Sequence, residues 1–272
     1  MATKVFISFD YEGIGGVASW TETEGDRRWN ELATRQLVAY CEGVFSTDPE
    51  AEVVVADSHA NGNNILWEQL PDRVSLIRGT PRNYYMFEGL DKSFTHLVLF
   101  GYHTAIGGGG MMDHTYSASA IYEIKINGKP VDEGLINAYA ASEYGVPLAF
   151  VYGDDKTADF YRAIPGIDTL ACKKAISRFA GEMRPLGELL RALTEKGQAL
   201  PTTKGKVLND PQRPIVCEMT MTDATRSYLC AVIPGVERPT ERTLRFTAHD
   251  YLELYRYLIT IVYICSMAKT IR

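Results

Sequence analysis

The stretch Val5-Phe6-Ile7-Ser8-Phe9 is followed at once by Asp10-Tyr11-Glu12-Gly13, and this junction decides how the chain is interpreted. An almost unbroken apolar run of this length is typical of a strand buried on both faces of a parallel sheet. If the strand geometry continues past Phe9, the side chains of Asp10 and Glu12 leave on the same side. The stretch therefore predicts a parallel strand with an acidic pair at its carboxyl end.

The same arrangement occurs twice more along the chain. Asp57-Ser58-His59 follows the apolar run at 53–56, and Gly101-Tyr102-His103 follows the run at 97–100. The carboxyl ends of parallel strands line one crevice, where ligands usually bind. Carboxylates and imidazoles together favour zinc, manganese or iron over calcium. We therefore expect a metal site in this crevice, and the number of donors allows two metals about 3.5–4 Å apart.

Strand-like and helix-like segments alternate through the first two hundred residues. This alternation predicts an α/β fold, a mostly parallel sheet in an α/β/α sandwich with the metal site at the carboxyl ends of the strands. A hairpin is expected at 119–127, where Asn127-Gly128 turns the chain. Further strands are expected at 52–56, 74–78, 96–100 and 147–152, and helices at 28–45, 133–144, 156–164 and 185–198.

A proline-containing segment at 200–213 is the best candidate for a linker. Strands at 215–219 and 244–247 and a helix at 251–269 are expected beyond it. We therefore expect a catalytic α/β domain over 1–200 and a smaller C-terminal α+β lobe over 210–272. The sequence does not decide whether the lobe is a separate domain.

Composition excludes several classes of protein. The chain has 272 residues, 46% of them hydrophobic, and a net charge of −6, which argues against a nucleic-acid partner. Its five cysteines are scattered without a C-x-x-C pair, so we expect no disulfide framework. Reduced cysteines are typical of cytoplasmic proteins, so we expect a cytoplasmic location. The most apolar segment, 258–265, is too short to span a membrane, and from the first residues we expect no secretory signal.

The five histidines divide into two groups. His59 and His103 directly follow predicted strands, whereas His96 begins a strand at the opposite end of the sheet and His249 precedes a helix, so these two are assigned to structure. His114 comes after His103 and a run of four glycines at 107–110. Such a run lets a loop fold back over a site, so His114 is the spare group for moving protons.

Several short motifs, taken in chain order, resemble the M55 family of D-aminopeptidases, over most of the chain and most densely from 5 to 180. They are Ser8-Phe9-Asp10-Tyr11-Glu12-Gly13, Asp57-Ser58-His59, Gly101-Tyr102-His103, Met112-Asp113-His114, Pro130-Val131-Asp132-Glu133, Asn137-Ala138-Tyr139, Val151-Tyr152-Gly153-Asp154-Asp155 and Lys174-Ala175-Ile176-Ser177-Arg178. The chain departs from the family pattern at 33–36, at Asp113 and in the glycine run. These departures bear on substrate preference.

The resemblance implies a zinc-dependent aminopeptidase that removes N-terminal, D-configured amino acids from short peptides or amides. Two zinc ions per subunit are implied, with manganese or another divalent metal as an alternative. The implied ligands are Asp10, which bridges, with Glu12, His59, His103 and Glu133. Glu133 enters through the resemblance alone. His114 matches the residue proposed as nucleophile or general base, and family members form rings, so a homo-oligomer, as large as a decamer, is implied.

Two other functions stay open at this point. A different two-metal hydrolase acting on amides or phosphoesters would use the same donors. A non-catalytic metal-binding assembly protein would keep the fold without turnover.

Overall fold

The computed structural model describes residues 3–209 and 212–268. Its centre is a six-stranded sheet in the order β3-β2-β1-β4-β7-β8, in which every neighbouring pair is parallel. The strands are β1 Lys4–Phe9, β2 Glu52–Asp57, β3 Val74–Ile77, β4 His96–Tyr102, β7 Leu148–Gly153 and β8 Asp168–Ala171. The α/β class and the mostly parallel sheet predicted from the sequence are confirmed.

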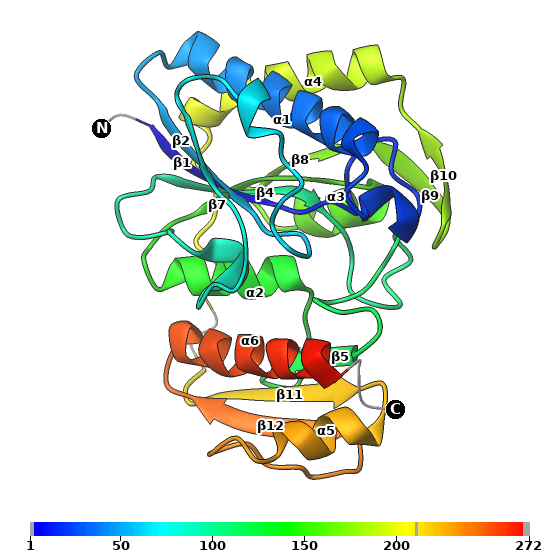
Figure 1. Ribbon diagram of the computed structural model, residues 1–272. Helices are drawn as coiled ribbons and strands as arrows, with labels where there is room; N and C mark the ends of the chain where they lie inside the picture. Colours follow the sequence, from blue (N-terminus) through cyan, green and yellow to red (C-terminus); the bar gives the residue numbers. More distant parts are fainter. Residues whose placement is uncertain (1–2, 210–211, 269–272) are drawn as a thin grey trace.

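Helices lie on both faces of this sheet (Figure 1). They are α1 Arg27–Thr47 and α4 Leu186–Ala199, which pack on each other, with α2 Glu133–Ser142 on the opposite face and α3 Asp155–Arg162 beside β7 and β8. Strand β1 divides its side chains between two cores, since Val5, Ile7 and Phe9 pack in one and Phe6 in the other. The absence of polar alternation in this strand follows from burial on both faces.

A second, antiparallel sheet forms a smaller lobe in the order β12-β11-β5-β6. Its strands are β5 Ile121–Ile126, β6 Lys129–Pro130, β11 Ile215–Met221 and β12 Thr243–Ala248, and its helices are α5 Ala224–Cys230 and α6 Tyr251–Met267. Asn127 and Gly128 join β5 to β6 with positive φ angles of 50° and 78°, as the hairpin prediction requires. The sheet therefore combines the hairpin with strands from the C-terminal segment.

Helix α6 connects the two parts of the molecule, because it lies between α2 and the strands β11 and β12 (Figure 1). The small lobe draws on residues 121–130 as well as on the expected C-terminal segment. The sequence could not indicate this pairing, which joins strands about ninety residues apart, and the division into domains stays a prediction. Part of the expected linker, residues 210–211, and the last residue of the expected final helix, Lys269, lie outside the described residues.

Several elements were not expected from the sequence. They are β8, α5 and the hairpin of β9 Lys173–Ser177 and β10 Ala180–Met183, together with the short 3-10 helices η1 Trp20–Thr23, η2 Trp67–Gln69, η3 Tyr85–Phe87 and η4 Leu200–Thr202. The hairpin is half-exposed and has no apolar run. None of the described helices is both long and apolar enough to cross a membrane.

Candidate metal centre

Two glycines bring the ends of β1 and β4 into contact. Gly101 has a φ of 83°, and a Cβ atom at this position would lie 2.1 Å from the carbonyl oxygen of Asp10. A Cβ atom on Gly13 would lie 2.0 Å from the carbonyl oxygen of Tyr102. Only glycine permits such close approach of two backbones. The acidic loop after β1 therefore lies directly against the segment that carries His103.

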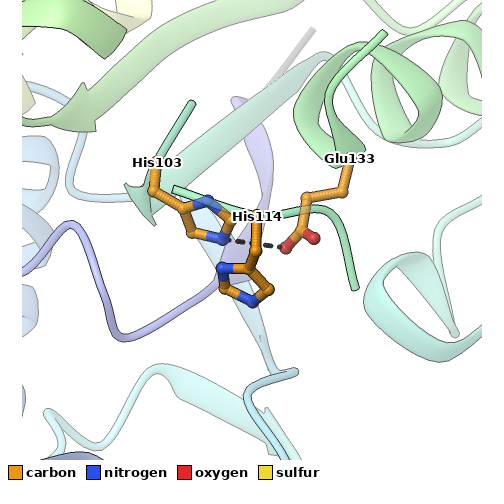
Figure 2. Close-up of side chains that lie close together, drawn as sticks. All are labelled: His103, His114 and Glu133. Atoms are coloured by element: carbon orange, nitrogen blue, oxygen red, sulfur yellow. Dashed lines mark ion pairs between the residues drawn. The ribbon is translucent and has the colours of Figure 1, made fainter. Parts of the chain in front are cut away.

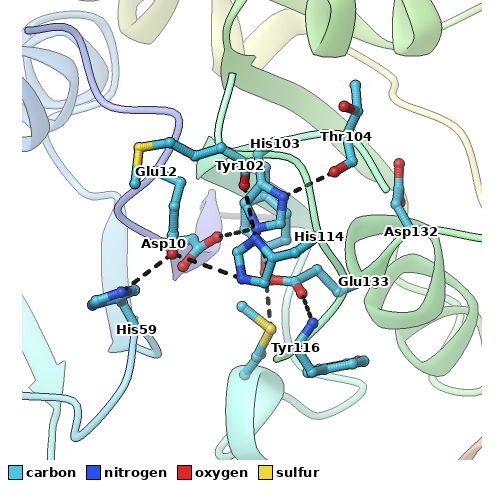
Figure 3. Close-up of polar contacts among 12 residues, drawn as sticks. Asp10, Glu12, His59, Tyr102, His103, Thr104, His114, Tyr116, Asp132 and Glu133 are labelled. Atoms are coloured by element: carbon cyan, nitrogen blue, oxygen red, sulfur yellow. Dashed lines mark hydrogen bonds and ion pairs between the residues drawn. The ribbon is translucent and has the colours of Figure 1, made fainter. Parts of the chain in front are cut away.

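The strand-end side chains converge in space (Figure 3). His59 Nε2 lies 3.3 Å from Glu12 Oε1, and His103 Nε2 lies 3.2 Å from Asp10 Oδ2 and 3.4 Å from Glu133 Oε1. Candidate ligand atoms of Asp10, Glu12 and His103 all lie within 4.8 Å of one another. All five residues named as metal ligands from the sequence therefore face one crevice.

His114 reaches the same crevice from the loop between β4 and β5. Its ring stacks on that of His103, with centroids 4.1 Å apart and an interplanar angle of 7° (Figure 2). Its Nε2 atom lies 3.7 Å from Glu12 Oε1. The indole of Trp20 meets the His114 ring edge-on with centroids 5.2 Å apart. The imidazole of His114 is thus held between an aromatic side chain and the cluster.

The three imidazoles of the cluster are oriented in the same way. Nδ1 of His103 lies 3.0 Å from the Thr104 carbonyl, Nδ1 of His114 lies 2.9 Å from the Met112 carbonyl, and Nδ1 of His59 lies 3.4 Å from Asn64 Oδ1. These oxygens only accept, so each Nδ1 carries the proton and donates it. Each Nε2 is therefore the ring nitrogen that faces the carboxylates and is left to bind a metal, which is the orientation that metal-ligating histidines adopt.

The donor set fits a divalent cation. Three buried atoms of the site have no hydrogen-bond partner among the described residues, namely Asp10 Oδ2, Glu12 Oε2 and His103 Nε2. Asp10 Oδ2 and His103 Nε2 lie 3.2 Å apart. Unpartnered buried acceptors that face one another are unfavourable. A zinc ion would satisfy them, because it binds imidazole nitrogen and carboxylate oxygen together.

The buried carboxylates have strongly shifted pKa values. Burial and the nearby Glu12 carboxylate raise the pKa of Asp10 to about 8. Burial opposes ionisation of Glu12 as well, but the adjacent His59 outweighs it and lowers the Glu12 pKa well below its usual range. Burial also disfavours the charged form of His59, yet Glu12 raises the His59 pKa to about 9. A bound dication would favour every carboxylate in its charged form.

Glu133 is fixed by its helix and by a neighbouring loop. It is the first residue of α2, whose N-cap Asp132 accepts a hydrogen bond from the Leu135 backbone N–H. The backbone N–H of Tyr116 donates to Glu133 Oε2, and Tyr116 adopts a φ of 57°. A left-handed aromatic residue at a candidate site suggests that the backbone is held there for function.

Asn64 is a site residue that the sequence did not indicate. Its side-chain amide donates to Asp57 Oδ1 and to the His59 carbonyl, while its Oδ1 faces His59 Nδ1. Asp57 also accepts from the backbone N–H groups of Asn64 and Ile65. The loop after β2 is therefore folded around a buried carboxylate that orients His59. Asn64 lies in an Asn-rich turn at 61–64, where nothing distinguishes it from its neighbours.

A cleft of about 760 Å³ opens over the cluster. One wall comes from α6, from η3 and from the loop before η3, and includes Tyr263 of α6 and Tyr85 of η3. The floor includes Asp10, Glu12 and Glu133. This volume is in the range of pockets for small ligands, and the floor carries negative charge.

The fold and cluster are those of a metal-dependent hydrolase, and the comparisons with known proteins identify its family. The model of the Peptidase M55 family, described as D-aminopeptidase, matches residues 3–260, so the chain belongs to this family of peptidases. It is 33% identical over 268 residues to a D-aminopeptidase of Bacillus subtilis (strain 168), covering 95% of this chain and 96% of the relative.

A solved structure has the same fold over nearly its whole length. It is described as the Zn-dependent D-aminopeptidase DppA from Bacillus subtilis, a self-compartmentalizing protease. The TM-score is 0.91 at 31% sequence identity, and the match covers 97% of this chain and 98% of that chain. The family expected from the sequence motifs is therefore confirmed.

Proposed function

We propose that this protein is a zinc-dependent aminopeptidase that releases N-terminal D-amino acids from short peptides or amides at a dinuclear centre. The observation that carries the proposal is the common orientation of three imidazoles, each with its Nδ1 proton tied to an oxygen and its Nε2 aimed at buried carboxylates. Family membership supports the peptidase chemistry. The DppA-like fold supports zinc as the metal.

The geometry favours two neighbouring cation positions. Glu12 and His59 form one pair of donors, at 3.3 Å, and His103 with Glu133 forms another, at 3.4 Å. Asp10 lies next to His103 and within reach of Glu12, so its carboxylate is the group able to bridge. When bound, the zinc ions would polarise the scissile carbonyl and make a nearby water more acidic.

His114 is the group best placed to move a proton. Burial and the adjacent His103 lower the pKa of His114, so the ring is neutral near pH 7. Its Nδ1 proton is engaged by the Met112 carbonyl, which leaves Nε2 as the accepting atom. We therefore assign His114 Nε2 as the general base, which takes a proton from the attacking water and passes it to the leaving amine.

The cleft fits a short peptide with a free N-terminus. Aromatic side chains such as Tyr85 and Trp20 line its sides and offer apolar contacts to the side chains of a short peptide. We propose D-configured residues as the substrate class because the family and both relatives are described as D-aminopeptidases.

We also propose that the chain self-associates, up to the ring-based decamer implied by the motifs. The DppA relative is described as self-compartmentalizing. Apolar side chains that remain exposed on the single chain, among them Ile176, Tyr228 and Val232, would be covered in such an assembly. Light scattering on the purified protein tests this, and a monomer at micromolar concentration would contradict it.

The function is tested by turnover and metal content on one sample. D-alanyl p-nitroanilide should be hydrolysed faster than its L-enantiomer, with about two zinc ions per chain and loss of activity on chelation. Hydrolysis of bis(p-nitrophenyl) phosphate alone would favour a phosphoesterase. Zinc binding without turnover of any substrate would favour the non-catalytic alternative.

The role of His114 is tested by His114→Ala. The variant should keep its zinc and lose about a hundredfold to ten-thousandfold in kcat, the usual contribution of a positioned base. A fully active variant would remove His114 from the mechanism.

A further inference from the structure

Lys173 places a buried ammonium group behind the acidic loop. It is the first residue of β9 and is only 3% exposed. Its Nζ donates to the carbonyl oxygens of Glu12 at 2.6 Å, Ile14 at 3.1 Å and Val17 at 2.6 Å. All three N–H donors of the ammonium are thereby used on one short backbone segment. Figure 1 shows β9 beside this segment, which follows β1.

The ammonium has no carboxylate partner. Among residues 3–209 and 212–268, no carboxylate lies within 4 Å of Lys173 Nζ. A lysine is almost never fully buried without such a partner, because removing the charge from water is costly. Burial accordingly lowers the pKa of Lys173. A cation kept in so unfavourable a place indicates a requirement at this position that an apolar side chain would not meet.

The segment 12–17 shows why hydrogen-bond donors are required at this position. This segment has no regular structure, and four of its carbonyl groups accept hydrogen bonds from Lys173 or from the neighbouring Cys172, whose thiol lies 3.0 Å from the Gly13 oxygen. Buried carbonyls without partners would destabilise such a loop. The side chains of 172–173 instead fix the backbone that begins at Glu12.

Fixing this backbone fixes the metal-binding side chain that it carries. The Glu12 carboxylate lies 3.3 Å from His59 Nε2, while the carbonyl of the same residue accepts from Lys173. We propose that Lys173 is a positioning residue, whose ammonium clamps the 12–17 segment so that the Glu12 carboxylate is held at the metal-binding position. This inference rests on the proposed function, since it assumes that Glu12 binds zinc.

The test compares zinc binding by Lys173→Met with that by Lys174→Met. Lys174 is the adjacent, exposed lysine of the same strand, so its variant is a matched control. We expect Lys173→Met to lose at least about tenfold in affinity for one of the two zinc ions, as other changes behind metal ligands do, while Lys174→Met binds as the wild type does. Isothermal titration of the metal-free proteins with zinc measures this.

A double-mutant cycle separates positioning from a general structural role. If Lys173 acts through Glu12, adding Lys173→Met to Glu12→Gln should change zinc affinity little further. If the lysine only stabilises the fold, the two losses should add, and the inference fails. Thermal unfolding of each metal-free variant reports the structural contribution separately.

Two further outcomes are decisive. If Lys173→Met does not fold, Lys173→Gln, which keeps part of the donor set, should lose at least about threefold in zinc affinity, and unchanged affinity in that variant overturns the inference. A wild-type protein that binds no zinc would instead overturn the proposed function, whereas zinc bound equally by wild type and Lys173→Met overturns only the role of Lys173.

Discussion

His96 and His103 lie at opposite ends of the same strand, β4, and their surroundings differ completely. Both are buried, at 8% and 1% exposure. His96 has ordinary partners on both ring nitrogens, the Thr203 carbonyl and the Thr95 hydroxyl. In the described part of the chain, the neighbours of His103 Nε2 are the carboxylates of Asp10 and Glu133. Since the residue type is identical, the difference comes from which end of a parallel sheet collects acidic loops.

The pKa values express the same contrast. Burial lowers the pKa of His96, because its hydrogen bond to the Thr203 carbonyl only partly offsets the cost of burying the charged ring. Burial also disfavours the charged form of His103, but Glu133 and Asp10 outweigh it and raise its pKa well above the usual value. A histidine that neighbouring carboxylates pull toward the charged form is one where a cation is favoured. The comparison therefore supports the proposal that one end of β4 binds metal, whereas the other end serves structural packing.

The largest expected effect distinguishes these two ends directly. His103→Ala removes a proposed zinc ligand between two carboxylates, so zinc content should fall and kcat/KM should drop by at least about a thousandfold, or ~4 kcal/mol in transition-state stabilisation. His96→Gln should keep its zinc and most of its activity. Metal analysis and turnover of both variants check this. A His103→Ala enzyme with normal zinc and normal turnover would remove the contrast.

A smaller effect is expected at Asn64, which contacts a proposed metal ligand. Asn64→Leu removes the acceptor that holds His59 Nδ1 and leaves Asp57 without one of its donors. Loss of such a partner typically costs about tenfold to a hundredfold in metal affinity or activity. Asn63→Leu, on the neighbouring exposed residue, is the control. Zinc titrations of the two variants should differ, and equal affinities would show that His59 needs no support from Asn64.

Residues at strand ends could be predicted because a parallel sheet brings the carboxyl ends of strands from distant parts of the chain to one edge. Asp10, Glu12, His59 and His103 follow apolar runs that are long enough to recognise, and parallel pairing then brings them together without further information. Glu133 begins a helix, a position at which acidic residues are favourable in any protein. Only the family motifs distinguished it from an ordinary helix terminus.

The supporting residues could not be predicted for a different physical reason. Lys173 contacts Glu12 across 161 positions of sequence, and Asn64 depends on the exact path of a short loop. The β9–β10 hairpin that carries Lys173 is short and half-exposed, so it lacks the apolar periodicity that identifies a strand. Contacts made by single polar groups leave no pattern in the sequence, whereas buried strands do.

The smallest expected effect is on stability at the structural end of β4. Because the pKa of His96 is lower in the folded than in the unfolded state, the unfolded chain binds the extra proton more readily. The free energy of unfolding should therefore fall as the pH falls below about 6.5, the ordinary pKa of histidine. His96→Gln removes this contribution, so its stability should decline less between pH 7.5 and 5.5 than that of the wild type.

Urea denaturation in the presence of a chelator measures the difference without interference from zinc, and His249→Gln, at an exposed histidine, is the control. Parallel pH curves for wild type and His96→Gln would mean that β4 buries His96 without a cost to its charged form.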